Sequence, residues 1–211
     1  VRTAAKYPAI NRFVVNRKIY SRNELVVAMV VQRAADAEGS MGKLSFELTD
    51  TVLDVNEKMN NYIDNNRNED SNDTDVIMRK LTKYSFLLGP AVAILKWADK
   101  YGLLPKAILD CTPFHASMVI SNLASIRTNH IFHHIYDFGT VSQIITIGNS
   151  ENRPIVKDGE IKLQKSMPLG VVCDERIASG GYYAKCFHEM ERLLKNPELM
   201  ETPPEEVNRD F

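Results

Sequence analysis

The segment from Val171 to Phe187, VVCDERIASGGYYAKCF, carries reactive residue types at the end of an apolar run. Polar side chains that follow a buried strand are a common way to build a site, because loops on a rigid scaffold carry much of protein function. Glu175 lies at the tip of the run, where a carboxylate can act as a general base or orient a substrate. The alternative is a solvated strand end in which Asp174, Glu175 and Arg176 form an internal ion pair.

Two other residue types in the chain could take part in chemistry. Cys173 precedes the charged cluster, but the acidic residues that follow it would tend to raise the pKa of its thiol, which disfavours a nucleophilic role. A helix through NHIFHHIY would put His130 and His134 on one face, as in a metal-binding pair. No third ligand lies nearby in the sequence, so we predict no metal site. The alternative is a polar turn between two strands.

Composition and absent motifs disfavour several classes of protein. The sequence has no GxGxxG or GxxxxGK[ST] phosphate-binding loop and no HExxH or spaced Cys/His cluster. Its 26 basic and 27 acidic residues give a formal net charge of −1, so no overall field attracts nucleic acid or an anionic membrane. No apolar run approaches the roughly 18 residues of a membrane span. The three cysteines lack CxxC spacing, which fits a reducing compartment, and we predict a cytoplasmic protein.

The length of 211 residues, with 44% apolar and 25% charged side chains, is enough for one sizeable core, and we predict a single domain over residues 1–211. The sequence begins without Met, as though inside a helix that Pro8 ends, so we expect the native N-terminal portion to be absent. Residues 65–75, NNRNEDSNDTD, contain no apolar side chain and are predicted to form an exposed loop.

Hydrophobic periodicity predicts an alternation of strands and helices. Two runs rich in Val and Ile, residues 10–20 and 23–33, are expected to form a hairpin, and residues 43–50 alternate like a half-buried strand. Asp50 is expected to cap the next helix, and residues 76–100 to be helical with an interruption at Gly89-Pro90, as either two helices or one sharply kinked helix. Further predicted elements are a short helix within 104–114, strands within 116–123, 138–148 and 167–175, a hairpin turn at Asp158-Gly159, and a helix over 179–196.

The order SMVISNLASI, SQIITIG, a DG hairpin, MPLGVVCDERIASGG and a final amphipathic helix resembles the catalytic domain of the dihydrolipoamide (2-oxoacid dehydrogenase) acyltransferases, which form one family with chloramphenicol acetyltransferase. The resemblance runs from about Tyr7 to Pro197 and is strongest from Ser117 onward. It implies a chloramphenicol acetyltransferase-like α/β fold, a two-layer sandwich with a mixed central sheet and helices mainly on one face. It also implies a homotrimer with the active-site channel between subunits.

The family signature after the penultimate strand is D-H-R-x-x-[DN]-G, which corresponds here to Asp174 through Gly180. Asp174, Arg176 and Gly180 match it and are expected to support the loop, whereas Glu175 replaces the His and Ser179 replaces the second acid or amide. The family's His removes a proton from a hydroxyl or thiol that attacks an acyl thioester. An ordinary carboxyl, with a pKa of about 4.3, is a weaker base than an imidazole at about 6.5. Glu175 would therefore be an unusual general base, and the resemblance makes Ser179 a second candidate catalytic residue of this loop.

The family's oxyanion stabiliser is a hydroxyl on the strand that here contains VISNL. Ser121 is the best match, and Asn122 could donate a second hydrogen bond to a tetrahedral intermediate. The alternative is that both residues simply end a strand. His133 and His134 are candidate substrate-binding residues, and either could in principle replace the missing base.

Two functions of different class stay open at this point. The first is transfer of an acyl group from acyl-CoA, the donor substrate, to an unknown hydroxyl, thiol or amine acceptor, without a metal. The second is a catalytically inactive relative that keeps the channel and binds a ligand or a partner in it. We prefer the enzyme, because a charged residue at the tip of a strand is costly unless it is solvated, paired or used.

Overall fold

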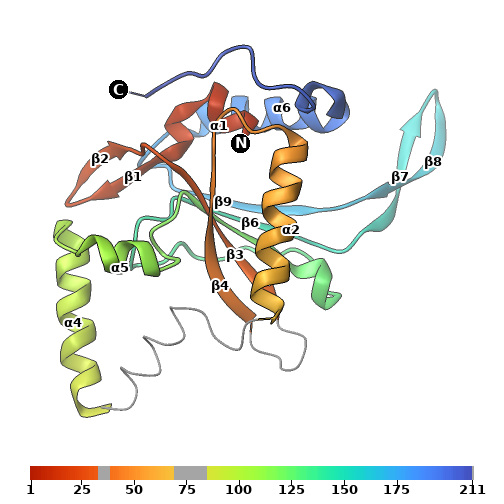
Figure 1. The fold of residues 1–211 in the computed structure, drawn as a ribbon. Coiled ribbons are helices and arrows are strands. Elements are labelled where there is room, and N and C mark those ends of the chain that lie inside the picture. The colour runs from red at the N-terminus through yellow and green to blue at the C-terminus, as the bar shows by residue number, and fades with distance from the viewer. Residues whose placement is uncertain (33–38, 69–84, 211) are drawn as a thin grey trace.

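The computed structural model describes residues 1–32, 39–68 and 85–210, and Figure 1 shows their arrangement. The strands are β1 (Arg12–Val15), β2 (Lys18–Ser21), β3 (Leu25–Gln32), β4 (Gly39–Phe46), β5 (Met118–Asn122), β6 (Gln143–Ile147), β7 (Glu151–Lys157), β8 (Glu160–Ser166) and β9 (Leu169–Cys173). The helices are α1 (Arg2–Lys6), α2 (Val52–Asn68), α4 (Ser85–Tyr101), α5 (Lys106–Cys111) and α6 (Gly180–Lys195), with short 3-10 turns η1 (Pro8–Asn11), η2 (Leu123–Ile126) and η3 (Pro197–Met200).

The central sheet has five strands in the order β4-β3-β5-β6-β9. The β3–β5 and β5–β6 pairs are parallel, whereas β4 and β9 run antiparallel to their neighbours at the two edges. The carboxyl ends of β5 and β6 therefore lie at one end of the sheet, and the carboxyl end of β9 lies at the other. The predicted mixed sheet is confirmed.

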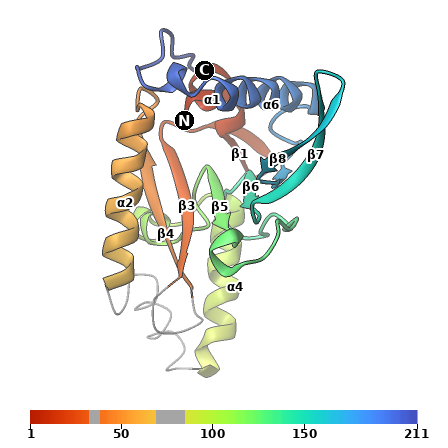
Figure 2. The same cartoon turned by 90° about the vertical axis from the view of Figure 1, so that its right-hand side faces the viewer.

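The two faces of the sheet are covered differently because side chains alternate along each strand. Leu25, Val27 and Met29 of β3 point into the larger core, which α1, α2 and α6 cover. The intervening Val26 and Ala28 point into a smaller core that contains Val119, Ile144 and Val141 and is covered by the chain before β6. Figures 1 and 2 both show α1 beside α6 on the larger core. The predicted arrangement, with helices mainly on one face, is confirmed.

The predicted hairpin between residues 10–20 and 23–33 is wrong. The first run folds back on itself, because Asn16 and Arg17 take positive φ values of 48° and 61° and join β1 to β2 in a two-residue turn. The second run becomes β3 and pairs with β4 and β5 instead. Asn is one of the few residues that adopt this backbone conformation readily, so Asn16 is the sequence signal for a turn inside the first run.

Two helix boundaries also differ from the prediction. Thr51, rather than Asp50, caps α2: Thr51 Oγ1 accepts from the Asp54 backbone N–H, and the Asp54 carboxylate accepts from the Thr51 N–H in return. The helix continues to Asn68, so the first four residues of the predicted 65–75 loop are helical, and the rest lie outside the described residues.

Of the two forms predicted around Gly89-Pro90, two separate helices are wrong, because Pro90 lies inside α4 and the helix continues through it. Pro90 has no backbone N–H, so one backbone hydrogen bond of the helix is missing at this position. Residues 76–84 of the same prediction lie outside the described part of the chain.

The predicted hairpin at Asp158-Gly159 is confirmed, with positive φ values of 57° and 79° at the two turn residues. Its strands, β7 and β8, form a separate two-stranded ribbon that projects from the body (Figures 1 and 2). Val156 pairs with Ile161, and Pro154 pairs with Leu163, so these four side chains share one face of the ribbon. Val156, Ile161 and Leu163 are 75%, 79% and 73% exposed. We call these four residues the apolar face of the ribbon.

Candidate functional site at the end of strand β9

A tight loop connects β9 to α6 and contains the predicted site residues 174–179. Asp174 is buried, and its carboxylate accepts hydrogen bonds from the Arg176 backbone N–H at 2.9 Å, from Nε at 2.9 Å and from Nη2 at 2.6 Å. Burial opposes ionisation of Asp174, but the bonds from Arg176 outweigh it and lower the pKa of the carboxyl group. The Asp174 N–H donates to the Ser142 carbonyl, and its carbonyl accepts from Tyr183 Oη, both at 2.9 Å.

Arg176 turns toward Asp174, and its side chain is 69% exposed. Among the described residues it forms no hydrogen bond with Glu175, and its guanidinium pairs with the Asp174 carboxylate instead. These contacts favour the predicted role of Asp174 and Arg176 as supports of the loop.

Glu175 is exposed, and its Oε1 lies against the beginning of α6. A Cβ added at Gly180 would be 3.2 Å from this oxygen, so the carboxylate rests on the first residue of the helix. The N-terminal end of a helix favours a nearby negative charge. Ser179 is the N-cap of α6, and its Oγ accepts from the Tyr182 N–H at 3.4 Å. The Ser179 hydroxyl is therefore engaged in capping, while the Glu175 carboxylate faces solvent.

Cys173 is unsuited to nucleophilic attack. Burial, with smaller contributions from Cys186 and Glu175, raises the pKa of its thiol to about 11. The thiolate, which is the nucleophilic form, is therefore scarce at neutral pH.

Ser121 and Asn122 are the last two residues of β5. Ser121 is half-buried and Asn122 is exposed, and the Asn122 carbonyl accepts from Ser125 Oγ at 2.6 Å. In the sheet register Ser121 is level with Thr146 of β6, which is level with Gly170 at the start of β9.

The segment that contains His130, His133 and His134 lies at the same end of the sheet as Ser121. The Ile131 N–H donates to Thr146 Oγ1 at 3.2 Å, and Thr146 Oγ1 donates to the Ile131 carbonyl at 2.7 Å. The segment forms neither helix nor strand, so His130 and His134 do not share a helical face and the premise of the metal pair is wrong. His133 and His134 are exposed.

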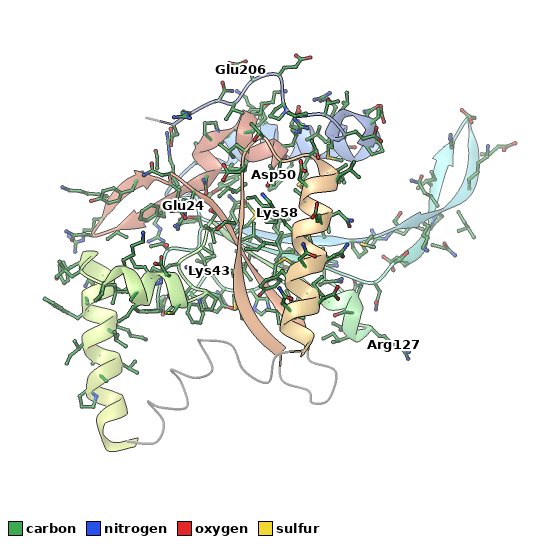
Figure 3. All side chains as sticks on the ribbon, in the orientation of Figure 1. Glu24, Lys43, Asp50, Lys58, Arg127 and Glu206 are labelled. Atoms are coloured by element: carbon green, nitrogen blue, oxygen red, sulfur yellow. The ribbon has the colours of Figure 1, made fainter. Side chains whose placement is uncertain are left out.

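The structure does not bring Ser121 and Glu175 together within one chain. Cys173 is two strands away from Ser121 and three residues beyond Gly170, the residue of β9 that is level with Ser121. This places Cys173 about 14 Å from Ser121, and Glu175 follows two residues later. Glu24, just before β3, and Arg127, just after η2, mark the two ends of the sheet on opposite sides of Figure 3. Catalytic groups must approach a shared reactant within about 3 Å or through one water. One chain therefore holds two separate halves of the predicted constellation.

Within residues 1–32, 39–68 and 85–210, no group of three or more His, Cys, Asp or Glu side chains is arranged to hold a metal ion. None of the helices in these ranges has the length and apolar character needed to cross a membrane.

Comparison with known proteins shows which family part of this chain resembles. Residues 115–202 match the family model of the 2-oxoacid dehydrogenases acyltransferase catalytic domain, and the match includes Ser121, Glu175 and Ser179. The predicted resemblance is confirmed. The sequence similarity to the family covers residues 115–202. The similarity of fold covers a much larger part of the chain.

Three solved structures share that fold. A probable dihydrolipoamide acetyltransferase from Listeria monocytogenes 4b F2365 gives a TM-score of 0.53 and 16% identity over 92% of this chain and 65% of its own. The Azotobacter vinelandii dihydrolipoamide acetyltransferase gives 0.52 and 14% over 94% and 66%, and the cubic core of the pyruvate dehydrogenase multienzyme complex gives 0.51 and 14% over 93% and 65%. The predicted fold class is confirmed, and the chain spans about two thirds of the length of these acyltransferases.

Proposed function

We propose that the protein is an acyltransferase that moves an acyl group from acyl-CoA to a hydroxyl, thiol or amine acceptor. The observation that carries this proposal is the match of residues 115–202 to an acyltransferase catalytic domain. The use of a CoA thioester also supports a cytoplasmic location.

The spacing of the candidate residues supports the assignment. The Azotobacter vinelandii enzyme has been studied for the catalytic role of a serine, a histidine and an asparagine, which are spaced by 52 and 4 positions. Ser121, Glu175 and Ser179 are spaced by 54 and 4 positions. The three positions of this chain thus follow nearly the same frame, with Glu and Ser in place of His and Asn.

The proposed reaction is an attack of the acceptor on the thioester carbonyl. Glu175 removes the proton of the attacking hydroxyl, thiol or amine, and Ser121 Oγ donates a hydrogen bond to the oxyanion of the tetrahedral intermediate. Collapse of the intermediate breaks the carbon–sulfur bond, and the CoA thiolate leaves and takes up a proton. Asn122, His133 and His134 are all exposed at the Ser121 end and are proposed to contact substrate there.

We place the complete site between subunits of a homotrimer. The separation of Ser121 from Glu175 within one chain supports this placement, because a neighbouring subunit must supply the missing half. The apolar face of the ribbon supports it as well. An isolated two-stranded ribbon is marginally stable in water, and exposed aliphatic side chains on a projecting element need a surface to cover them.

The proposed activity is tested by release of free thiol from acetyl-CoA with a panel of hydroxyl, amine and dithiol acceptors. We expect turnover by the native protein and a loss of at least about 100-fold in Glu175→Gln, the effect typical of removing a general base. The matched control is Glu205→Gln, an exposed acid of the C-terminal segment, which should keep full activity. Turnover by Glu175→His alone, with an inert native protein, would contradict the proposed role of Glu175.

A mixing experiment tests the placement between subunits. Ser121→Ala and Glu175→Gln are each expected to be nearly inactive, but trimers refolded from an equal mixture should regain about a quarter of native activity, since half of the Ser121 positions and half of the Glu175 positions are intact and pair at random. Mixed trimers that stay as inactive as either variant would show that both groups act within one chain.

A further inference from the structure

The C-terminal segment crosses the molecule to reach the neighbourhood of the site loop. After η3 it runs over α1 toward the β1–β2 hairpin (Figure 1). The Asn208 N–H donates to the Ala5 carbonyl at 2.8 Å, and Asn208 Nδ2 donates to the Lys6 carbonyl at 2.9 Å. The Arg2 guanidinium donates to the Thr202 carbonyl. These contacts hold the segment on α1 and carry Asp210 to the edge of β1.

Asp210 is held by several hydrogen bonds. Its carboxylate accepts from Arg12 Nε at 2.5 Å and from Arg12 Nη2 at 2.6 Å, and Ser21 Oγ donates to it at 2.7 Å. The Asp210 side chain is 14% exposed. A two-point contact of this kind fixes the plane of a guanidinium as well as its position.

Arg12 in turn is connected to the site loop at both of its ends. Its Nη1 donates to the Ile177 carbonyl at 3.3 Å. Its own carbonyl accepts from Ser142 Oγ at 2.5 Å, and the Ser142 carbonyl accepts from the Asp174 N–H at 2.9 Å. Glu175 lies between the two anchored positions, so the geometry of Arg12 sets the geometry of the backbone that presents Glu175.

We propose that Asp210 is a positioning residue for the Glu175 loop and acts through Arg12. The proposal rests on the proposed function in taking Glu175 as the acting group, but the ordering of the loop is measurable without any activity. A segment that merely covered α1 would not need Asp210, because Asn208 and the Arg2 contact already hold it there. Removal of the Asp210 carboxylate frees the guanidinium to rotate and weakens its bond to Ile177.

The test is hydrogen exchange of the folded full chain, read on peptides that cover residues 172–181. The amides of Arg176 and Ile177, which bond to Asp174, report the loop directly. In Asp210→Asn we expect their exchange to be about tenfold faster, a local loss of roughly 1.4 kcal/mol of protection. The matched control, Asn208→Ala, should speed exchange near α1 and in the C-terminal segment and leave residues 172–181 unchanged.

Two further variants test the proposal if Asp210→Asn disturbs the whole fold. If Asp210→Asn speeds exchange throughout the chain, the milder Ser21→Ala, which removes one of the three bonds to Asp210, should still show a smaller effect confined to the loop. Asp210→Glu should restore part of the protection. Native exchange at residues 172–181 in a folded Asp210→Asn protein, or an equal loop effect from Asn208→Ala, would overturn the proposal.

Activity measurements distinguish a failure of this proposal from a failure of the proposed acyltransferase function. If the native protein transfers acyl groups, Asp210→Asn should lower kcat with little change in KM for the acyl donor, since the variant disturbs the presentation of Glu175 rather than donor binding. A loop that loosens in Asp210→Asn while the native protein fails to turn over any acceptor would refute the acyltransferase and leave the positioning role intact.

Discussion

At the scale of single residues, the Glu175 carboxylate lies beside a glycine at the start of the following helix. The carboxylate rests against Gly180, the first residue of α6, where the absence of a Cβ makes room for Oε1. Gly181, the next residue, has no atom within 4 Å of the position that its Cβ would take. The chain therefore offers a pair of adjacent glycines in the same helical turn, of which only one touches the candidate base.

We expect Gly180→Ala and Gly181→Ala to stabilise the protein by about 0.5–1 kcal/mol each, because both restrict the unfolded chain at helical positions. Only Gly180→Ala should change the acyl transfer rate, since its methyl group displaces the Glu175 carboxylate by a few tenths of an ångström. Thermal unfolding and thiol release on both variants check this prediction. An equal effect of the two substitutions on the rate would show that Glu175 is not held against Gly180 during turnover.

At the scale of secondary structure, α1 and α6 are held together by a buried carboxylate. Glu189 of α6 accepts from Lys6 Nζ at 2.9 Å and from Arg192 Nη2 at 2.6 Å. The bonds from Arg192 and Lys6 outweigh burial and lower the pKa of Glu189 from 4.5 to about 2. Because the pKa is lower in the folded state, the stabilisation is complete above pH 4.5 and is lost as the pH falls toward 2.

Glu189→Gln should lower the free energy of unfolding at pH 7 by about 2 kcal/mol, the usual scale for hydrogen bonds to charged groups. The difference from the native protein should shrink as the pH falls from about 4.5 and vanish near pH 2. The control is Glu191→Gln, whose ion pair with Lys195 is exposed to solvent and should therefore contribute little to stability at any pH. Urea titrations across this pH range provide the measurement, and a difference independent of pH would contradict the assignment.

Features with a local sequence signal were predicted correctly more often than features that depend on residues far apart in the chain. Asp158-Gly159 and the β5, β6, β9 and α6 segments were predicted because turn chemistry and periodicity act over a few residues. The β1–β2 hairpin was not predicted, because its turn at Asn16-Arg17 lies inside a run that is otherwise rich in Val and Ile. The candidate site came from the family resemblance, but the separation of Ser121 from Glu175 depends on strand order, which no local pattern encodes. The Arg12–Asp210 contact joins residues 198 positions apart and had no sequence signal.

At the scale of the whole molecule, the ribbon formed by β7 and β8 is the feature that one chain leaves unexplained. Its apolar face is exposed, whereas the opposite face is mainly polar and carries Arg153, Lys162 and Gln164 beside Ile155. A homotrimer in which the ribbon packs on the neighbouring subunit accounts for both faces, because only the apolar one would be buried.

If the proposed trimer forms in this way, Ile161→Lys should convert it to single chains, since the substitution places a charge in the proposed contact. The matched control is Gln164→Lys, which adds the same charge to the opposite face of the same strand and should leave the trimer intact. Sedimentation equilibrium on both variants gives the mass of the assembly. A trimer that survives Ile161→Lys would exclude the apolar face of the ribbon as the contact.

The strand directions of the sheet have a further consequence. Because β5 and β9 end at opposite ends of the sheet, each newly made chain carries both halves of the proposed site but no complete one. Acyl thioesters are reactive, and a single chain would be unable to consume them. The specific activity should then fall on dilution below the dissociation constant of the assembly, so that the amount of protein in the cell would itself decide when the enzyme is switched on.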